Sequence, residues 1–168
     1  MDRNAKILTV SDSVSEGYRE DLAGPLLATH LVEAGFAVVE RRVVPDGVES
    51  VASALTQMAE GFYGVLITTG GTGFAPRDQT PEGTLRVIER EAPGLSEAMR
   101  LANPLGRLSR ARAGTRGQCL ILNTPGSPDG ARECLEAVVD ILAHLLDVLG
   151  GSQSPHPPEM GGSTATSS

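Results

Sequence analysis

A short apolar segment runs directly into a loop of glycine and threonine, and we expect chemistry at this junction. Residues 65–69 read Val-Leu-Ile-Thr-Thr, and the chain continues as Gly70, Gly71, Thr72 and Gly73. An uncharged β-branched run is typical of a strand covered on both faces of a parallel sheet. Glycine permits positive φ and a close backbone approach, so successive N–H groups can converge on an anion, with the Thr69 and Thr72 hydroxyls as further donors. The junction therefore predicts a phosphate site.

A helix start is expected close to this loop. Thr80 precedes Pro81 and Glu82, a pattern typical of an N-cap, a proline at the first helical position and an acid in the first turn. Free N–H groups at a helix start attract anions. We therefore expect a second source of donors beside the glycine loop.

Two aspartates are candidates to face the same loop. Asp46 lies in a Pro-Asp-Gly turn after a strand-like segment, and Asp78 lies inside the glycine-rich region. Aspartate in a turn commonly caps a helix or satisfies its own backbone, and a Pro-Asp-Gly turn before a helix is a standard place for such a cap. The alternative is Mg²⁺, which one or two carboxylates hold while phosphate oxygens and waters complete its coordination. Two carboxylates beside a phosphate loop indicate nucleoside triphosphate chemistry.

The sequence matches neither of two common nucleotide-binding motifs, and it does not favour hydrolysis through a covalent intermediate. No Gly-Lys-Ser/Thr follows the glycines, and their spacing is not that of a dinucleotide fingerprint. His30 and His144 lie in helix-like segments, and no Ser-His-acid arrangement is evident. Phosphoryl or nucleotidyl transfer fits better, because positioning and charge neutralisation carry most of that catalysis. If the nucleophile is itself a phosphate, no strong general base is required.

Strand-like and helix-like segments alternate along the chain. The expected strands are residues 6–11, 36–44, 65–69 and 118–123, and the expected helices are 22–34, 48–60, 81–90, a short one ending near 102, and 129–149. This order favours an α/β protein with a mostly parallel sheet and helices on both faces. Such a sheet gathers the loops 11–21, 70–80 and 123–127 at the carboxyl ends of its strands, where we expect one pocket. We assign no element to residues 103–117.

Composition limits the class of protein. The chain has 168 residues, 40% of them hydrophobic and 21% charged, which fits one soluble domain. The net charge of −7 argues against nucleic-acid binding, and no apolar stretch is long enough for a membrane span. The start of the chain lacks signal-peptide organisation, so we expect a cytoplasmic protein. Five arginines within residues 100–116 form either a solvated loop or an anion-attracting wall.

The composition changes near residue 150. Residues 151–168 consist mainly of Gly, Ser, Pro and Thr, which cannot bury enough apolar surface to order a segment. We therefore expect one domain over residues 1–150 and a disordered tail over residues 151–168.

Several segments resemble one known family. Residues 68–73, Thr-Thr-Gly-Gly-Thr-Gly, and residues 76–82, Pro-Arg-Asp-Gln-Thr-Pro-Glu, closely resemble the signature of the MogA, MoaB and gephyrin G-domain family of molybdenum cofactor proteins. Further family-like segments follow in the right order: 7–13, 44–46, 93–94, 108–110, Gly114 and 123–128. The resemblance covers about residues 5–150, and this many ordered motifs make chance a poor explanation.

The resemblance implies a fold and an activity. Family members are three-layer α/β/α sandwiches that usually form trimers, and some MoaB members form hexamers. The implied activity is that of a molybdopterin adenylyltransferase, which uses ATP and Mg²⁺ to place AMP on the terminal phosphate of molybdopterin and releases pyrophosphate. The alternative is a catalytically inactive MoaB-like protein that serves as a pterin-binding carrier or scaffold.

The resemblance also implies roles for individual residues. Asp46 and Asp78 match the acidic residues important for activity, in agreement with their candidacy as Mg²⁺ ligands. The expected nucleotide and phosphate site consists of Thr69, Gly70, Gly71, Thr72, Gly73, Asn123, Pro125 and Gly126. The expected molybdopterin site consists of Ser11, Asp12, Ser13, Ser109 and Arg110.

Overall fold

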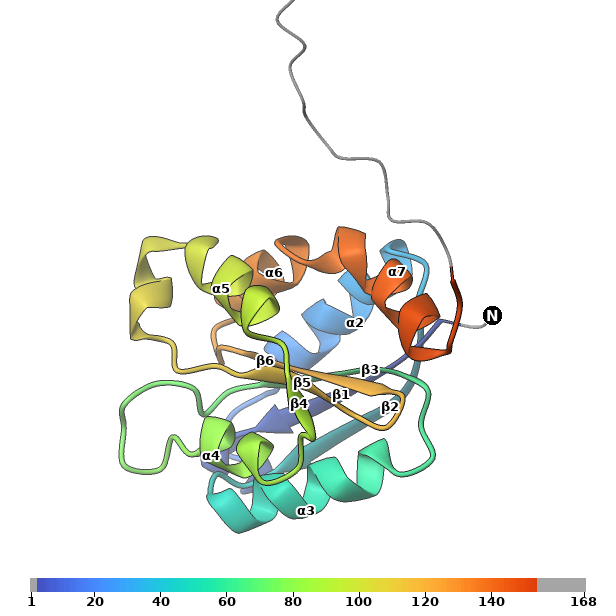
Figure 1. Cartoon of the computed structure of the whole chain (residues 1–168). Coiled ribbons are helices and arrows are strands. Elements are labelled where there is room, and N and C mark those ends of the chain that lie inside the picture. The colour runs from blue at the N-terminus through green and yellow to red at the C-terminus, as the bar shows by residue number, and fades with distance from the viewer. Residues whose placement is uncertain (1–2, 154–168) are drawn as a thin grey trace, which may run out of the picture.

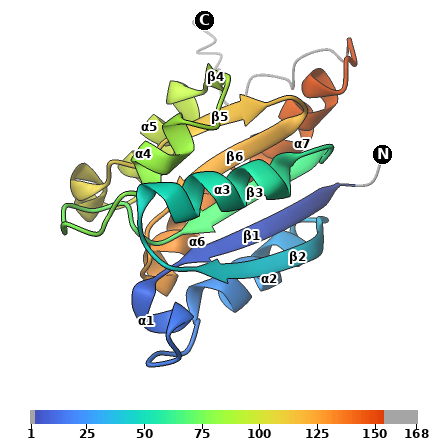
Figure 2. The same ribbon diagram turned by 90° about the horizontal axis from the view of Figure 1, so that it is seen from below.

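The computed structural model describes residues 3–153, so the expected tail lies, from residue 154 on, outside the described residues. Six strands form one sheet in the order β2-β1-β3-β6-β5-β4 (Figures 1 and 2). The strands are β1 (Asn4–Val10), β2 (Ala37–Val44), β3 (Gly64–Thr69), β4 (Arg90–Glu91), β5 (Ala113–Arg116) and β6 (Cys119–Thr124). The four strands β2, β1, β3 and β6 are mutually parallel, and β5 runs antiparallel to both of its neighbours. The predicted mostly parallel sheet is confirmed.

Helices cover both faces of this sheet, which confirms the expected three-layer sandwich (Figure 1). One face carries α2 (Ala23–Glu33), α5 (Pro93–Leu101), α6 (Pro128–Glu136) and α7 (Val139–Leu149). The other face carries α3 (Val48–Ala59) and α4 (Thr80–Leu85). No helix within residues 3–153 is both long enough and apolar enough to cross a membrane.

Side chains of the central strands supply a core to each face. Ile7 and Ile67 belong to the cluster under α2, α5, α6 and α7, whereas Leu8 and Leu66 belong to the cluster under α3. This alternation follows from the two-residue period of a strand. Every residue of β3 is buried, as the uncharged run predicts, whereas exposed positions alternate along the edge strand β2.

The prediction of one helix over residues 129–149 is wrong. The chain forms α6 and α7 with a break between them, where Val138 adopts φ −131° and ψ −11°. Neither residue 137 nor residue 138 is a glycine or proline that would announce a break. Val138 is buried in the core, so tertiary packing overrides the local helical pattern here.

Three other segments differ from the sequence-based expectation. The helix expected over residues 81–90 ends at Leu85, and the chain then joins the sheet edge as β4, where the Glu89 N–H donates to the Thr115 carbonyl at 2.8 Å. Residues 103–117, to which we assigned no element, form a 3₁₀ helix, η1 (Pro104–Leu108), and strand β5. Inside the expected loop 12–21 lies a one-turn helix, α1 (Asp12–Ser15).

The carboxyl ends of β1, β3 and β6 lie at one edge of the sheet. Helix α1 follows β1 there, the glycine loop follows β3, and the start of α6 follows β6 (Figure 2). The topology thus gathers the three predicted loops as expected for a parallel sheet.

Candidate active site

Two adjoining clefts open at this edge, in place of the one pocket expected. The larger, about 650 Å³, lies between the glycine loop, α5, η1 and the start of α6. The smaller, about 430 Å³, lies between the glycine loop, the end of β1 and the start of α2. Four residues line both clefts: Gly71, Asp78, Gly126 and Ser127. The glycine loop and the loop after β6 therefore form the wall at which the clefts meet.

The glycine loop needs glycine at two positions for its backbone conformation. Gly70 has φ +105° and Gly71 has φ +69°, which side chains rarely adopt. A Cβ on Gly70 would overlap the Val10 carbonyl, and one on Gly71 would overlap the Thr80 hydroxyl. Gly73 does not have positive φ, but a Cβ there would lie 2.9 Å from Oδ2 of Asp78.

The loop keeps some of its N–H groups for a ligand. The Gly70 N–H donates to the Thr124 carbonyl at 3.1 Å and is therefore occupied. Among residues 3–153, no acceptor takes the N–H groups of Gly71, Thr72 or Gly73. Thr69, expected to donate to the anion, instead donates its hydroxyl to the Pro125 carbonyl at 2.8 Å. Its side chain therefore joins two loops.

Thr80 ties helix α4 to the glycine loop. Its hydroxyl donates to the Gly70 carbonyl at 2.8 Å, and its N–H donates to the Gly71 carbonyl at 3.0 Å. The prediction that Thr80 is an N-cap is wrong, since α4 begins at Thr80 and follows Gln79, which makes no side-chain cap. The Thr80 side chain holds the loop instead.

Asp46 approaches the glycine loop from the turn after β2. Its Oδ2 accepts from the Asp12 N–H at 2.9 Å, and its Oδ1 lies 3.1 Å from where a Cβ on Gly71 would stand. It does not cap α3, whose N-cap is Gly47. Burial, followed by the negative charges of Asp12 and Asp78, raises the pKa of Asp46 above its ordinary value.

Asp78 lies against the same loop, five positions after Gly73. Its Oδ2 accepts from the Ala75 N–H at 3.0 Å, which is the local turn bond common for aspartate. The same oxygen lies close to Gly73. Asp46 and Asp78 both line the smaller cleft, and the charge of Asp78 reaches Asp46 strongly enough to help raise the pKa of Asp46.

The two carboxylates fit a Mg²⁺ ion shared with phosphate groups. Within residues 3–153 no three His, Cys, Asp or Glu side chains are grouped to hold a metal. Mg²⁺ does not need such a cage, because it keeps waters and substrate phosphates among its six ligands. Burial and the negative charges of Asp12 and Asp78 raise the pKa of Asp46, and a cation bound at this place would offset those negative charges.

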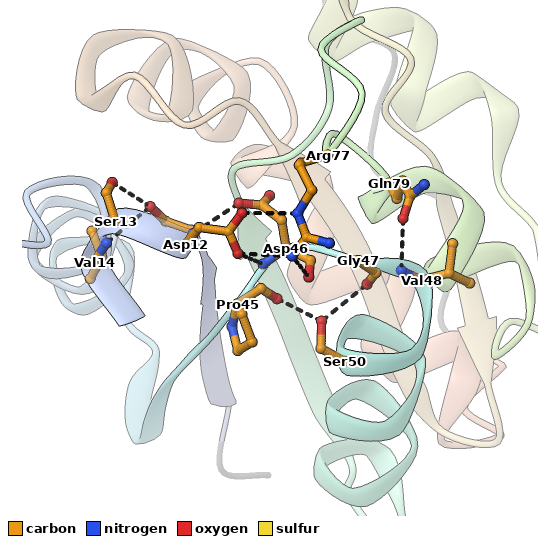
Figure 3. A network of polar contacts seen from close by, with 11 residues as sticks. Asp12, Ser13, Val14, Pro45, Asp46, Gly47, Val48, Ser50, Arg77 and Gln79 are labelled. Atoms are coloured by element: carbon orange, nitrogen blue, oxygen red, sulfur yellow. Dashed lines mark hydrogen bonds and ion pairs between the residues drawn. The ribbon is translucent and has the colours of Figure 1, made fainter. Parts of the chain in front are cut away.

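Asp12 and Arg77 form an exposed ion pair next to Asp46 (Figure 3). The Arg77 Nε and Nη2 donate to the two oxygens of Asp12, each at 3.0 Å. These hydrogen bonds are the main reason that the pKa of Asp12 lies below its ordinary value. Arg77 lies within the signature of residues 76–82, but sequence reasoning assigned it no role, because that role depends on a contact across 65 positions.

The expected molybdopterin residues near α1 differ in their surroundings. Ser11 lines the smaller cleft, and its Oγ accepts from the Val14 N–H at 3.3 Å as the N-cap of α1. Ser13 lies 3.2 Å from Ser11, measured between the two Oγ atoms. Neither Asp12 nor Ser13 is among the described residues that line the two clefts.

Arg110 holds the glycine loop from outside. Its Nε donates to the Gly73 carbonyl at 2.8 Å, its Nη2 donates to the Asp78 carbonyl at 2.7 Å, and its Nη1 pairs with Glu82. Ser109 lines the larger cleft and accepts from the Ala111 N–H at 3.2 Å through its Oγ. Of the two expected molybdopterin residues in this segment, Ser109 faces a cleft, whereas the guanidinium of Arg110 is occupied by the protein.

Asn123 lies beneath the clefts. It is fully buried, and its amide nitrogen donates to the hydroxyls of Thr68 and Thr84 at 3.0 Å and 2.9 Å. Its Oδ1 accepts from the Arg112 N–H at 3.0 Å. We therefore expect Asn123 to position its neighbours rather than to contact a ligand.

Pro125 and Gly126, the other expected nucleotide residues in this loop, line the larger cleft. A Cβ on Gly126 would lie 3.4 Å from Cα of Gly70, so the two loops pack closely. Gly126 also lines the smaller cleft and thus belongs to the wall that the two clefts share.

Of the five arginines of residues 100–116, Arg100 lines the larger cleft and the other four line neither cleft. Each of the five donates a hydrogen bond within the protein, that of Arg107 going to Pro104 inside η1. Another contact in the larger cleft was missed: Asn103 Nδ2 donates to Glu133 Oε2 at 2.8 Å and links η1 to α6. Its two residues lie 30 positions apart and belong to no motif.

These features define a class of α/β protein in which a glycine loop with unengaged N–H groups, close to two carboxylates, lies at the carboxyl edge of a mostly parallel sheet. Residues 6–144 match the model of a family described as a probable molybdopterin binding domain. The chain belongs to this family, which confirms the resemblance found in the sequence motifs.

Relatives with high coverage support this membership. A molybdopterin adenylyltransferase from Helicobacter pylori (strain J99) is 37% identical over 153 residues, covering 87% of this chain and 87% of the relative. One from Escherichia coli (strain K12) is 38% identical over 147 residues, covering 83% and 75%. The crystal structure of the molybdopterin biosynthesis enzyme MoaB from Thermus thermophilus matches with a TM-score of 0.83 at 44% identity, covering 89% of this chain and 98% of that chain.

Proposed function

We propose that the protein is a molybdopterin adenylyltransferase of molybdenum cofactor biosynthesis, using ATP and Mg²⁺. The observation that carries the proposal is that Asp46 lies against Gly71 and Asp78 against Gly73, with both aspartates lining the smaller cleft. The two relatives named molybdopterin adenylyltransferase, similar over most of their length, support the same activity.

The site suits a transfer between two phosphate-bearing molecules. In the proposed reaction an oxygen of the terminal phosphate of molybdopterin attacks the α-phosphorus of ATP. A new P–O bond forms, the bond between the α-phosphorus and the bridging oxygen breaks, and pyrophosphate leaves. The attacking phosphate is anionic at neutral pH, so no side chain must remove a proton. This agrees with a site whose described residues include no histidine.

The protein's own residues would position the phosphate groups of the substrates and hold the ion that neutralises their charge. The N–H groups of Gly71, Thr72 and Gly73 would bind phosphate oxygens, since no acceptor in the described part of the chain takes them. Asp46 and Asp78 would hold Mg²⁺, which offsets the charge on the phosphates and on the leaving pyrophosphate. Two clefts that share one wall suit two substrates whose phosphates must meet.

A direct assay tests the activity. The purified chain is incubated with ATP, Mg²⁺ and molybdopterin, and adenylyl-molybdopterin and pyrophosphate are measured. Both products are expected, in equal amounts. Binding of molybdopterin without either product would instead indicate the carrier or scaffold function. For substitutions of Asp46 and Asp78 in this assay, Asp140→Asn serves as a matched control, because Asp140 is exposed on α7 and lines neither cleft.

We also propose that the protein forms a trimer, on the resemblance alone. Light scattering coupled to size exclusion is expected to give three times the mass of one chain, and a monomer at micromolar concentration would contradict this. A hexamer would match the MoaB members of that type. The cytoplasmic location expected from the sequence stays a prediction.

A further inference from the structure

We propose that Arg77 is a positioning residue that acts through Asp12 to hold the Asp46 carboxylate against the glycine loop. The inference rests on the proposed function, since it concerns the orientation of a proposed Mg²⁺ ligand. It adds two residues, neither of them in a cleft, to the machinery of the site.

Arg77 joins three separate segments of the chain (Figure 3). It belongs to the loop after β3, Asp12 opens α1, and Asp46 follows β2. Besides its two hydrogen bonds to the Asp12 carboxylate, its Nη2 donates to the Asp46 carbonyl at 2.9 Å. A planar guanidinium that binds a carboxylate through two parallel bonds fixes both position and orientation, which an ammonium does not.

Asp12 passes this constraint on to Asp46. The Asp46 N–H donates to Oδ1 of Asp12 at 3.1 Å, and the Asp12 N–H donates to Oδ2 of Asp46 at 2.9 Å. Because Oδ2 of Asp46 is held in this way, its Oδ1 is left to face Gly71. The orientation of the Asp46 carboxylate therefore depends on where the Arg77 ion pair holds the Asp12 backbone and side chain.

The placement of the three residues argues against direct ligand contact by Arg77. Asp46 lines the smaller cleft, whereas neither Arg77 nor Asp12 is among the described residues lining the two clefts. The hydrogen bonds of the Arg77 side chain go to Asp12 and Asp46. Its Nε and Nη2 are therefore engaged by the protein.

The test measures metal affinity as well as turnover. Mn²⁺ replaces Mg²⁺ as the probe, and its binding to the folded protein in the presence of a non-hydrolysable ATP analogue is followed by electron paramagnetic resonance. The variants are Arg77→Gln, Arg77→Lys, Asp12→Asn and the double variant Arg77→Gln/Asp12→Asn. Arg86→Gln is the matched control, since Arg86 forms an exposed ion pair with Glu49 and lines neither cleft.

Loss of a residue that orients a metal ligand lowers metal affinity about 10-fold to 100-fold. We expect a loss in this range for Arg77→Gln, a smaller loss for Arg77→Lys, and none for Arg86→Gln. The double variant is expected to lose little more than the worse of its two single variants, because both substitutions break one connection. The KM for ATP at saturating Mg²⁺ should change less than the Mn²⁺ affinity.

Three results would overturn the proposal. These are an unchanged Mn²⁺ affinity in Arg77→Gln, full additivity in the double variant, and a rise in the KM for ATP without a loss of Mn²⁺ affinity. Asp46→Asn is measured alongside. If that variant loses Mn²⁺ and Arg77→Gln does not, the positioning role alone fails; if neither loses Mn²⁺, the metal assignment in the proposed function fails as well. Melting temperatures identify any variant that fails to fold, and Arg77→Lys then carries the test.

Discussion

Asp46→Asn should separate catalysis from stability. The substitution keeps the shape of the side chain and an oxygen that can accept from the Asp12 N–H, as Oδ2 does now at 2.9 Å. It removes only the negative charge that a cation requires. The N-cap of α3 is Gly47 and not Asp46, so the helix has no cap to lose.

The expected loss is large. Removing one electrostatic partner of a transition state costs about 2.7 to 4 kcal/mol. That energy corresponds to a drop of about 100-fold to 1,000-fold in turnover. Asp78→Asn should behave in the same way, because Asn also keeps an oxygen for the Ala75 N–H. Molybdopterin binding should survive in both variants.

The same substitution, Asp46→Asn, should not lower the stability of the fold and should even raise it at neutral pH. The folded protein raises the pKa of Asp46, mainly by burial, so its proton stabilises the fold below the unfolded pKa and this stability is lost as pH rises through the folded pKa. Asparagine is uncharged at every pH and avoids this loss. Without Mg²⁺, Asp46→Asn should therefore melt at or above the wild-type temperature at pH 7, and the difference should vanish near pH 3.

Turnover is followed by pyrophosphate release and unfolding by circular dichroism, with Asp140→Asn as the control. Near-wild-type turnover in both Asp46→Asn and Asp78→Asn would refute the assignment of metal and active site. A turnover loss that only parallels a lower melting temperature would reduce Asp46 to a structural residue.

Three further substitutions or treatments give separate checks. Gly71→Ala should lower the melting temperature and abolish turnover, because the new Cβ would overlap the Thr80 hydroxyl at a φ that alanine disfavours; wild-type stability would contradict the loop geometry. Asn123→Ala should destabilise the fold by about 3 kcal/mol, since it leaves buried partners unsatisfied, and urea unfolding measures this. Burial raises the pKa of Cys119 to about 12 and that of Cys134 to about 11, so iodoacetamide at pH 8 should label neither thiol until the protein unfolds, as mass spectrometry will show.

Sequence reasoning succeeded where the signal is local. The uncharged β-branched run of residues 65–69 requires cover on both faces, and that alone predicts a central strand whose carboxyl end meets ligands. The same rule predicted that Asp46 and Asp78 face a common pocket, because each follows a strand of the parallel sheet, and both line the smaller cleft. Their part in catalysis stays a prediction.

Prediction from the sequence failed for elements and residues whose structure depends on contacts with distant parts of the chain. The short strands β4 and β5 exist through pairing at the sheet edge, not through a pattern of their own. Arg77, Asn123 and Arg110 have roles set by partners 11 to 65 positions away, and a single sequence does not show such partners. An arginine in a glycine-rich loop is equally compatible with a solvated charge.

Hydrogen bonds and packing contacts between the loops affect how the site recognises its ligands. The Thr69 hydroxyl binds the Pro125 carbonyl, Gly126 packs on Gly70, and Arg110 binds the Gly73 carbonyl. Loops joined in this way have already given up most of their conformational entropy on folding, so a ligand need not order them when it binds. The site is therefore expected to select molecules that match its existing shape, and an analogue with one atom misplaced should lose affinity sharply because the walls do not adapt.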